Sequence, residues 1–204
     1  MNSVSAKQQK IDRLLDQGVT LLLEKGYHAS GLKEILQTVQ IPKGSFYAYF
    51  ESKEQFAVAA IQHYINPFIL RLQQHMDTPG NDGLMALQHY YAELIEQVQL
   101  TGYKGGCLLG NLMAEIGDTS PLCRAALLEA VARYSALQAQ ALLRGQQQGV
   151  IRLDKSAQSM ADLLFNSWQG ALLRMKIEQS IAPLQSCCQA LLNDYFSVAD
   201  YSYQ

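Results

Sequence analysis

The chain has 204 residues, of which 49% are hydrophobic and 17% are charged, with a formal net charge of −2. This composition excludes general disorder, and the acidic balance argues against a protein that binds nucleic acid over its whole surface. The length suits one large domain, or a small domain joined to a larger one.

Apolar residues recur at spacings of three and four rather than two, which predicts an all-α chain. A first helix is expected over about Ser5–Lys25, with Gly26 at its C-terminal end. The hydroxyl of Ser30 is placed to cap a second, short helix over about Gly31–Val39.

A third helix of barely two turns begins at Pro42, whose missing N–H costs nothing in a first turn. Ser52 caps a fourth helix, and Glu54 in its first turn complements the helix dipole. Short helices joined by a four-residue turn resemble a helix-turn-helix, which leaves the outer face of the third helix free.

The later helices are longer and are separated by turn-forming segments. Breaks at Asp77–Gly83, Thr101–Gly106 and Gly117–Pro121 delimit a fifth helix and a helix that starts near Cys107. Three further helices follow: one over about Pro121–Gln148, one through Trp168 and Lys176, and a last one after Pro183.

The segment "PKGSFYAYF" carries the chemistry that a helix entering the major groove requires. Lys43 reaches a base edge or a phosphate, while Gly44 and Ser45 have little bulk and let the backbone approach DNA closely. The phenolic hydroxyls of Tyr47 and Tyr49 suit phosphate oxygens.

The neighbouring residues complete this interpretation. Phe46 and Phe50 lie four apart and are expected to pack inward, and Lys53 adds a phosphate contact at the start of the next helix. Residues 1–64 carry 7 Lys+Arg against 6 Asp+Glu, whereas residues 65–204 carry 9 against 12, which favours an N-terminal contact with an anion. The competing interpretation is a plain helical hairpin with exposed tyrosines.

The motifs "GYHAS", "LKEIL" and "IPKGSFYAYFESKEQF" closely resemble the DNA-binding region of the TetR/AcrR family of bacterial transcriptional regulators. The resemblance covers about residues 5–60. It implies an all-α, TetR-like fold with a three-helix helix-turn-helix DNA-binding domain at 1–51 and an effector-binding and dimerisation domain at 52–204. The residues it assigns to DNA binding are Ser30, Lys43, Gly44, Ser45, Tyr47, Tyr49 and Lys53.

The family resemblance also implies a homodimer on a palindromic operator, in which late helices of both subunits form a four-helix bundle. The matching segments are Pro121–Gln148 and Ala157–Lys176. The implied function is that of a repressor released from DNA by a small-molecule or reactive electrophile or oxidant signal.

The segments "GYKGGCLLGNLMAEIGD" and "LRMKIEQSIAPL" resemble the NemR-like, electrophile- and oxidant-responsive subgroup, with Cys107 at its reactive cysteine and Lys176 at the partner lysine. A helix N-terminus and a nearby lysine favour thiolate independently of that resemblance. A buried, inert cysteine is the alternative, and a non-covalent ligand is the alternative signal. Trp168 either lines an effector cavity or fills the core.

Other classes find little support in the sequence. No signature of a Cys-His hydrolase or a phosphate loop is present, so we expect no enzyme, although a Cys-dependent enzyme or a plain helical interaction module stays open. The four cysteines lack CxxC spacing, and we expect no metal and no cofactor. Without a signal peptide or an apolar run of roughly 20 residues, the expected location is the cytoplasm.

Overall fold

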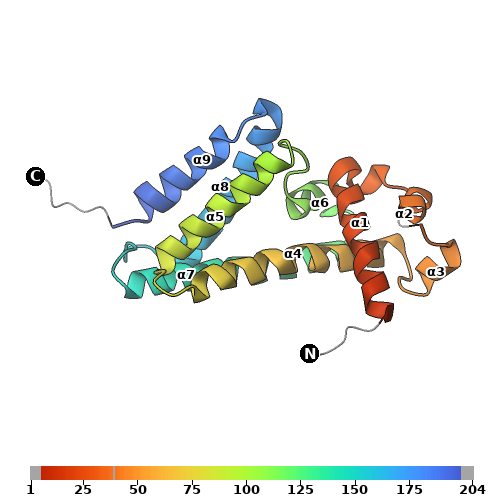
Figure 1. Ribbon diagram of the computed structural model, residues 1–204, viewed down its shortest axis with the longest axis horizontal. Helices are drawn as coiled ribbons and strands as arrows, with labels where there is room; N and C mark the ends of the chain where they lie inside the picture. The colour runs from red at the N-terminus through yellow and green to blue at the C-terminus, as the bar shows by residue number, and fades with distance from the viewer. Residues whose placement is uncertain (1–5, 39, 199–204) are drawn as a thin grey trace, which may run out of the picture. The chain divides into compact units, whose positions relative to one another are not determined.

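The computed structural model describes residues 6–38 and 40–198 of the chain (Figure 1). In this part of the chain the secondary structure is helical, and strand-like pairing is confined to one bridge between Ile151 and Ser197. The all-α prediction is therefore confirmed. The helices are α1 Ala6–Ala29, α2 Leu32–Thr38, α3 Lys43–Tyr47, α4 Lys53–Asp77, α5 Gly83–Leu100, α6 Leu108–Ile116, α7 Pro121–Gln147, α8 Ala157–Glu178, α9 Ala182–Cys188 and the π-helix η1 Gln189–Tyr195.

The chain divides into two compact units. The first consists of Met1–Pro67 and Cys107–Val131, and the second of Phe68–Gly106 and Ala132–Gln204. Helices α4 and α7 each contribute residues to both units. The predicted domain boundary between residues 51 and 52 falls in the short segment directly before α4 and stays a prediction.

The first unit is built around an aromatic cluster of Phe46, Phe50 and Phe56, whose ring centroids lie 5.2 to 5.6 Å apart. Phe46 and Phe56 are fully buried, and Phe50 is nearly so. The prediction that Phe46 and Phe50 pack inward is thus confirmed. Gly18 lets α1 approach this cluster, because a Cβ at that position would lie 2.1 Å from Cζ of Phe56.

Local chemistry sets the ends of these helices. The Ser52 hydroxyl accepts a hydrogen bond from Gln55 N at 3.1 Å, as expected of the residue that caps α4. Gly26, predicted to end the first helix, has non-helical dihedral angles of φ 78° and ψ 176°, so the first helical segment ends there as predicted, and a short second segment beyond this kink continues to Ala29. Pro42 lies at the N-cap of α3, one residue before the position predicted.

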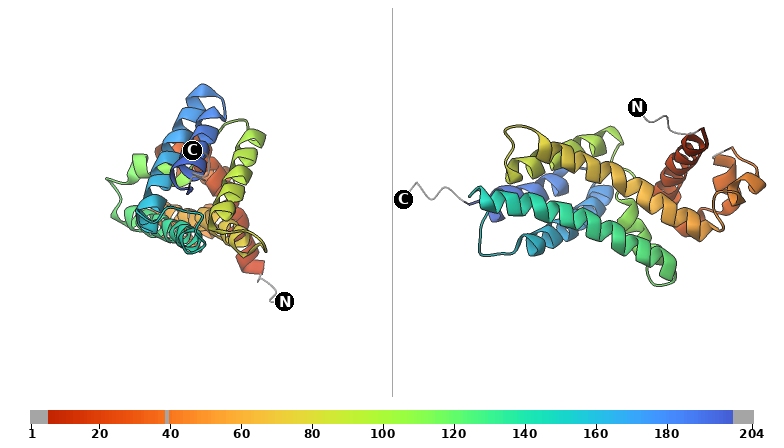
Figure 2. Two further views of the ribbon diagram at one scale, coloured as in Figure 1. Left: turned by 90° about the vertical axis from the view of Figure 1, so that its left-hand side faces the viewer. Right: turned by 90° about the horizontal axis from the view of Figure 1, so that it is seen from below.

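The second unit holds α5, α8, α9 and η1 together with parts of α4 and α7. Helices α8 and α9 lie side by side, and α5 contacts α9 and η1 (Figure 2). Asp82 caps α5 by accepting from Met85 N at 2.7 Å, and Ser156 caps α8 by accepting from Ser159 N at 3.1 Å. Among the described residues, no helix is both long enough and apolar enough to cross a membrane.

Close backbone contact joins α5 to α7 in this unit. A Cβ at Gly83 would lie 2.0 Å from the carbonyl oxygen of Ala141 and 2.4 Å from the amide nitrogen of Gly145. Only glycine fits at this crossing without displacing the backbone of α7. The guanidinium of Arg144 donates to the carbonyls of Met76, at 2.5 Å, and Asn81, at 2.9 Å, which fixes the turn before α5.

Candidate nucleic-acid interface

The turn between α2 and α3 positions the third helix. Gln40 adopts a left-handed conformation with φ 53°, and its N–H donates to Gln37 O at 3.3 Å. The N–H of Ile41 donates to Leu36 O at 3.2 Å. These two bonds form a Schellman motif, which satisfies the last carbonyls of α2 and turns the chain toward Pro42.

Helix α3 has one buried side and one open side. Phe46 anchors it in the aromatic cluster, whereas Lys43 and Gly44 are exposed and Tyr47 exposes 46% of its surface. The Lys43 ammonium lies 5.9 Å from the centroid of the Tyr47 ring, on the open side. Space is open around Gly44, since no heavy atom lies within 4 Å of a Cβ built there. This arrangement is that of a helix-turn-helix unit.

Ser45 and Tyr49 are half-buried residues of the same segment. The structure therefore brings together five of the seven residues that the sequence assigned to DNA, namely Lys43, Gly44, Ser45, Tyr47 and Tyr49. The other two lie elsewhere in the first unit.

Ser30 and Lys53 are engaged inside the protein. Ser30 is fully buried, and its hydroxyl donates to the carbonyl of Gly26 at 2.6 Å. The ammonium of half-buried Lys53 donates to the carbonyl of Tyr27 at 2.5 Å and lies 4.1 Å from the centroid of the Tyr27 ring. Burial lowers the pKa of Lys53, and the charge of Glu115 opposes that shift.

A carboxylate from α6 meets the same end of α1. One oxygen of Glu115, Oε2, accepts from the backbone N–H groups of Tyr27, at 2.7 Å, and His28, at 3.1 Å. Nε2 of His28 lies 3.1 Å from the carbonyl oxygen of Glu115. The kink at Gly26 exposes these N–H groups, and nothing in the sequence signals the contact because its partners are almost ninety residues apart.

A second contact ties the start of α7 to α4. The Ser120 hydroxyl donates to the carboxylate of Glu54 and also accepts from Cys123 N at 3.0 Å, which caps α7. The thiol of Cys123 is fully buried and lies 3.9 Å from the carbonyl oxygen of Glu54. Burial raises the pKa of Cys123, so this thiol stays protonated near neutral pH.

The predicted sensor residues do not share one unit. Cys107 is a half-buried residue at the N-cap of α6 in the first unit, and it follows Gly105 and Gly106, which both have positive φ. Lys176 lies in the last turn of α8 in the second unit. Their predicted pairing stays a prediction.

Trp168 belongs to a buried polar and aromatic cluster in the second unit. Its ring packs edge-on against Tyr91 with centroids 4.7 Å apart. The Tyr91 hydroxyl accepts from Gln138 Nε2 at 2.5 Å, and the hydroxyls of Tyr90 and Tyr134 lie 2.8 Å apart. Oε1 of Gln138 is a buried acceptor without a hydrogen-bond partner among the described residues. Burial raises the pKa of Tyr91, so its hydroxyl remains neutral.

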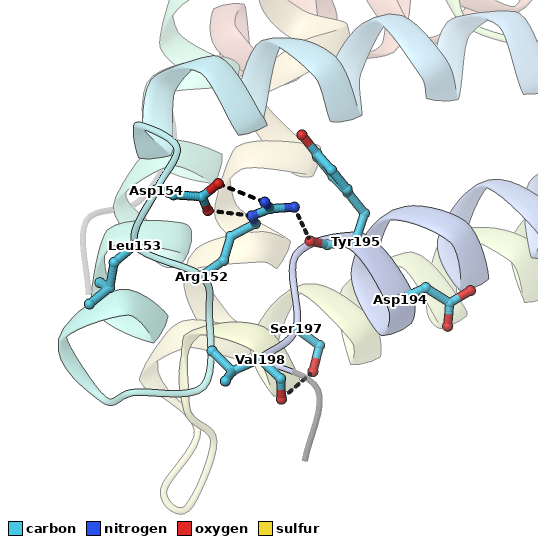
Figure 3. A pocket seen from close by; sticks show the side chains of 7 residues that line it. All are labelled: Arg152, Leu153, Asp154, Asp194, Tyr195, Ser197 and Val198. Carbon is cyan, nitrogen blue, oxygen red and sulfur yellow. Dashed lines mark hydrogen bonds and ion pairs between the residues drawn. The ribbon is translucent and has the colours of Figure 1, made fainter. Parts of the chain in front are cut away.

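A surface hollow of about 550 Å³ lies between the α7–α8 connection and the end of η1 (Figure 3). Among the described residues that line it, the cation is Arg152, which is paired with both carboxylate oxygens of Asp154 at 2.6 and 2.7 Å. The guanidinium also donates to the carbonyl of Tyr195 and lies 4.4 Å from the centroid of its ring. The positive charge that the described residues bring to this hollow is therefore already engaged by Asp154 and Tyr195. In the described part of the chain, no group of three or more His, Cys, Asp or Glu residues is placed to hold a metal ion.

Two family models match the chain along most of its length. The model for bacterial regulatory proteins of the tetR family matches residues 14–60, and the model for the tetracyclin repressor-like C-terminal domain matches residues 83–191. The first match covers the helix-turn-helix unit, and the second covers most of α5 to η1. The fold and site define a helix-turn-helix regulator, and the chain belongs to the TetR family.

Relatives of known name agree with this assignment. HTH-type transcriptional repressor DhaR of Mycobacterium sp. (strain GP1) is 36% identical over 171 residues, which cover 84% of each chain. HTH-type transcriptional repressor NemR of Escherichia coli (strain K12) is 32% identical over 182 residues, which cover 89% of this chain and 92% of NemR.

Solved structures show the same fold. The crystal structure of reduced E. coli NemR aligns with a TM-score of 0.84 at 31% identity, over 92% of this chain and 97% of that one. The regulatory protein TetR from Rhodobacter sphaeroides aligns with a TM-score of 0.82 at 32% identity, over 89% and 96%. The resemblance to the TetR family and to NemR, read first from short motifs, thus extends over nearly the whole chain.

Proposed function

We propose that this protein is a transcriptional repressor that binds a palindromic operator as a homodimer and leaves it in response to a small-molecule or electrophile signal. The observation that carries this proposal is the open side of α3, where Lys43, Gly44 and Tyr47 are exposed to solvent while Phe46 holds the helix in the core. Relatives named as transcriptional repressors support the direction of regulation.

The open side of α3 suits the major groove. The Lys43 ammonium reaches guanine acceptors or a phosphate from the first turn of the helix, where recognition helices contact base edges. The Tyr47 hydroxyl is a donor to phosphate oxygens. Such a contact fixes the position of the protein on the duplex but does not distinguish between base sequences. The open space at Gly44 lets the backbone of α3 approach the DNA closely.

Dimerisation is proposed through α8. Its outer side presents an exposed stripe in which Leu163, Gly170, Leu173 and Ile177 follow at spacings of seven, three and four. Leu173 exposes 62% and Ile177 81% of their surfaces, which is unusual for large aliphatic residues. An apolar stripe of this spacing matches the packing of helices in a four-helix bundle. This stripe supports the contribution of Ala157–Lys176 to the dimer that the family resemblance implies, and Pro121–Gln148 stays the predicted second segment.

The proposed signal acts on Cys107. A thiolate there adds to an electrophilic carbon of a quinone and forms a C–S bond, or is oxidised by hypochlorite. The residue starts α6, and the same helix carries Glu115, which holds the end of α1. Added bulk at the start of this nine-residue helix therefore shifts Glu115 and, through it, the end of α1 that precedes the helix-turn-helix.

A second route is a non-covalent effector, which the unpartnered Oε1 of Gln138 favours. A buried acceptor without a partner costs about 1–3 kcal/mol. A neutral ligand with a hydroxyl or amide donor would satisfy it, and the rings of Trp168 and Tyr91 lie in the same cluster. In this route the Gln138→Leu variant keeps its operator affinity and loses its response to the effector.

The DNA-binding proposal is tested by selecting the operator from a random double-stranded library and measuring affinity by fluorescence anisotropy. Lys43→Ala is expected to cost roughly 1–3 kcal/mol on the selected site if the lysine contacts a base. Tyr47→Phe is expected to weaken binding to selected and unrelated DNA about equally. Unchanged affinity in both variants would remove α3 from the interface.

The signal is tested on the same complex. A quinone or hypochlorite is expected to release wild-type protein but not Cys107→Ser, whereas the matched control Cys187→Ser responds like wild type. Release of Cys107→Ser at the wild-type dose would exclude this cysteine as the sensor and favour the non-covalent route.

A further inference from the structure

Tyr27, near the end of α1, is held by side chains from two other helices. Its backbone N–H donates to the Glu115 carboxylate of α6, and its carbonyl accepts from the Lys53 ammonium of α4. The same ammonium lies over the Tyr27 ring at 4.1 Å, within the range of a cation–π contact. Both polar groups of one peptide residue are thus fixed by charged side chains.

We propose that Lys53 and Glu115 are positioning residues that fix the entry of the helix-turn-helix unit, and that Lys53 is not a phosphate contact. This inference rests on the proposed DNA-binding function, and it reassigns a lysine that the family resemblance places on the DNA. The carbonyl and the ring of Tyr27 hold the half-buried Lys53 ammonium against the end of α1, away from the exposed side of α3 that carries Lys43.

The contacts that Lys53 and Glu115 make with Tyr27 form a clamp, and this clamp lies where it sets the position of α2 and of the DNA-binding helix α3. Helix α2 begins at Leu32, five residues after Tyr27, and the intervening Ser30 is buried with its hydroxyl on the carbonyl of Gly26. The chain between the clamp and α2 therefore has little freedom of its own. A change in the position of Tyr27 passes to α2 and, through the Schellman turn, to α3.

Two adjacent residues at the start of α4, Lys53 and Glu54, bind different helices of the first unit. Lys53 holds the end of α1, while Glu54 accepts from Ser120, which caps α7. The turn between α6 and α7 is thus attached to the helix-turn-helix region at both of its ends. Glu115, before the turn, binds the end of α1, and Ser120, after it, binds Glu54 at the start of α4. Because each tie involves a carboxylate, its bonds are about twice as strong as neutral ones.

Salt dependence separates positioning from phosphate contact for Lys53. Each phosphate neutralised contributes about −0.9 to the slope of log K against log salt. Lys53→Met is expected to weaken operator binding about tenfold with an unchanged slope, because the DNA contacts lose alignment rather than number. For comparison, Lys43→Met on the exposed side of α3 reduces the slope magnitude by about 0.9 if Lys43 contacts a phosphate and relaxes sequence preference if it contacts a base.

Two results for Lys53→Met would overturn the proposal. One is a slope whose magnitude falls by about 0.9, which would make Lys53 a phosphate contact. The other is an affinity and slope equal to those of wild type. Failure of the proposed function itself is distinct, because wild-type protein would then not prefer the selected operator over unrelated DNA.

Glu115→Ala provides an independent test, because the direction of its effect on operator affinity separates a positioning role from simple electrostatics. This test remains valid if Lys53→Met does not fold. Removal of a negative charge near DNA strengthens binding when only electrostatics acts. The positioning role predicts the opposite, a loss of about ten- to hundredfold, since two charge-assisted bonds to α1 disappear. The control Glu51→Ala removes an exposed carboxylate of the same unit and is expected to bind as well as wild type or more tightly. Binding by folded Glu115→Ala at or above the affinity of Glu51→Ala would overturn the role of Glu115.

Discussion

Replacement of Gly26 by alanine tests the geometry that joins α1 to α6. The backbone at Gly26 has φ 78° and ψ 176°, a region that is essentially restricted to glycine. Holding a side chain there costs about 1–3 kcal/mol of strain. A Cβ would in addition lie 2.3 Å from Oε1 and 2.8 Å from Oε2 of Glu115.

The second part of the cost comes from that carboxylate. Because Glu115 is a flexible side chain, it moves away from a new Cβ rather than clashing with it. Moving away breaks the bonds from the N–H groups of Tyr27 and His28, and bonds to charged groups contribute about 1.5–3 kcal/mol each. Since solvent replaces part of this loss, we expect Gly26→Ala to destabilise the protein by about 3–5 kcal/mol.

Urea unfolding at one fixed protein concentration measures this difference. Gly31→Ala is the matched control, because Gly31 lacks a positive φ and no atom lies within 4 Å of a Cβ built there. That change is expected to be neutral or to stabilise by about 0.4–1 kcal/mol through the unfolded state. If Gly26→Ala unfolds at the same urea concentration as Gly31→Ala, neither the strain nor the contact with Glu115 contributes as argued.

Gly83→Ala is expected to lower the urea midpoint by an amount that corresponds to about 1–3 kcal/mol, since a Cβ there meets the backbone of α7 at 2.0 Å; an unchanged midpoint would contradict the close helix crossing. Iodoacetamide at pH 8 is expected to alkylate Cys107 before Cys188, because burial raises the pKa of Cys188 to about 12 and leaves almost no thiolate. Peptide mass spectrometry gives the order, and equal rates would refute it. Leu173→Glu on the exposed side of α8 is expected to yield monomers in light scattering, whereas a persistent dimer would place the interface elsewhere.

Short-range chemistry made much of the fold predictable from sequence. The Ser52 cap depends on a residue three positions away, and the inward side of α3 follows from the spacing of Phe46 and Phe50. Both features are determined within one turn of helix, so one sequence is enough to locate them. The same holds for the breaks that separate the later helices.

Long-range contacts made the rest unpredictable. Gly26 ends the first helical segment as the sequence predicts, but the sequence does not show the short segment that continues to Ala29 or its contact with the carboxylate of Glu115, eighty-nine positions after Gly26. Lys53 is predicted to contact a phosphate, and the sequence gives no sign of the hydrogen bond from its ammonium to the carbonyl of Tyr27, twenty-six positions earlier. The π-helix η1 after α9 likewise has no signature in the apolar spacing.

The central claim is that two copies of α3 read two half-sites of one palindrome. The most direct measurement is an anisotropy titration of wild-type protein on the selected palindrome, on the same duplex with one half-site scrambled, and on unrelated DNA. The account predicts a dissociation constant in the range of about 10⁻⁸–10⁻¹¹ M for the palindrome, with two chains bound per duplex and much weaker binding to the other two. Equal affinity for all three duplexes would contradict it.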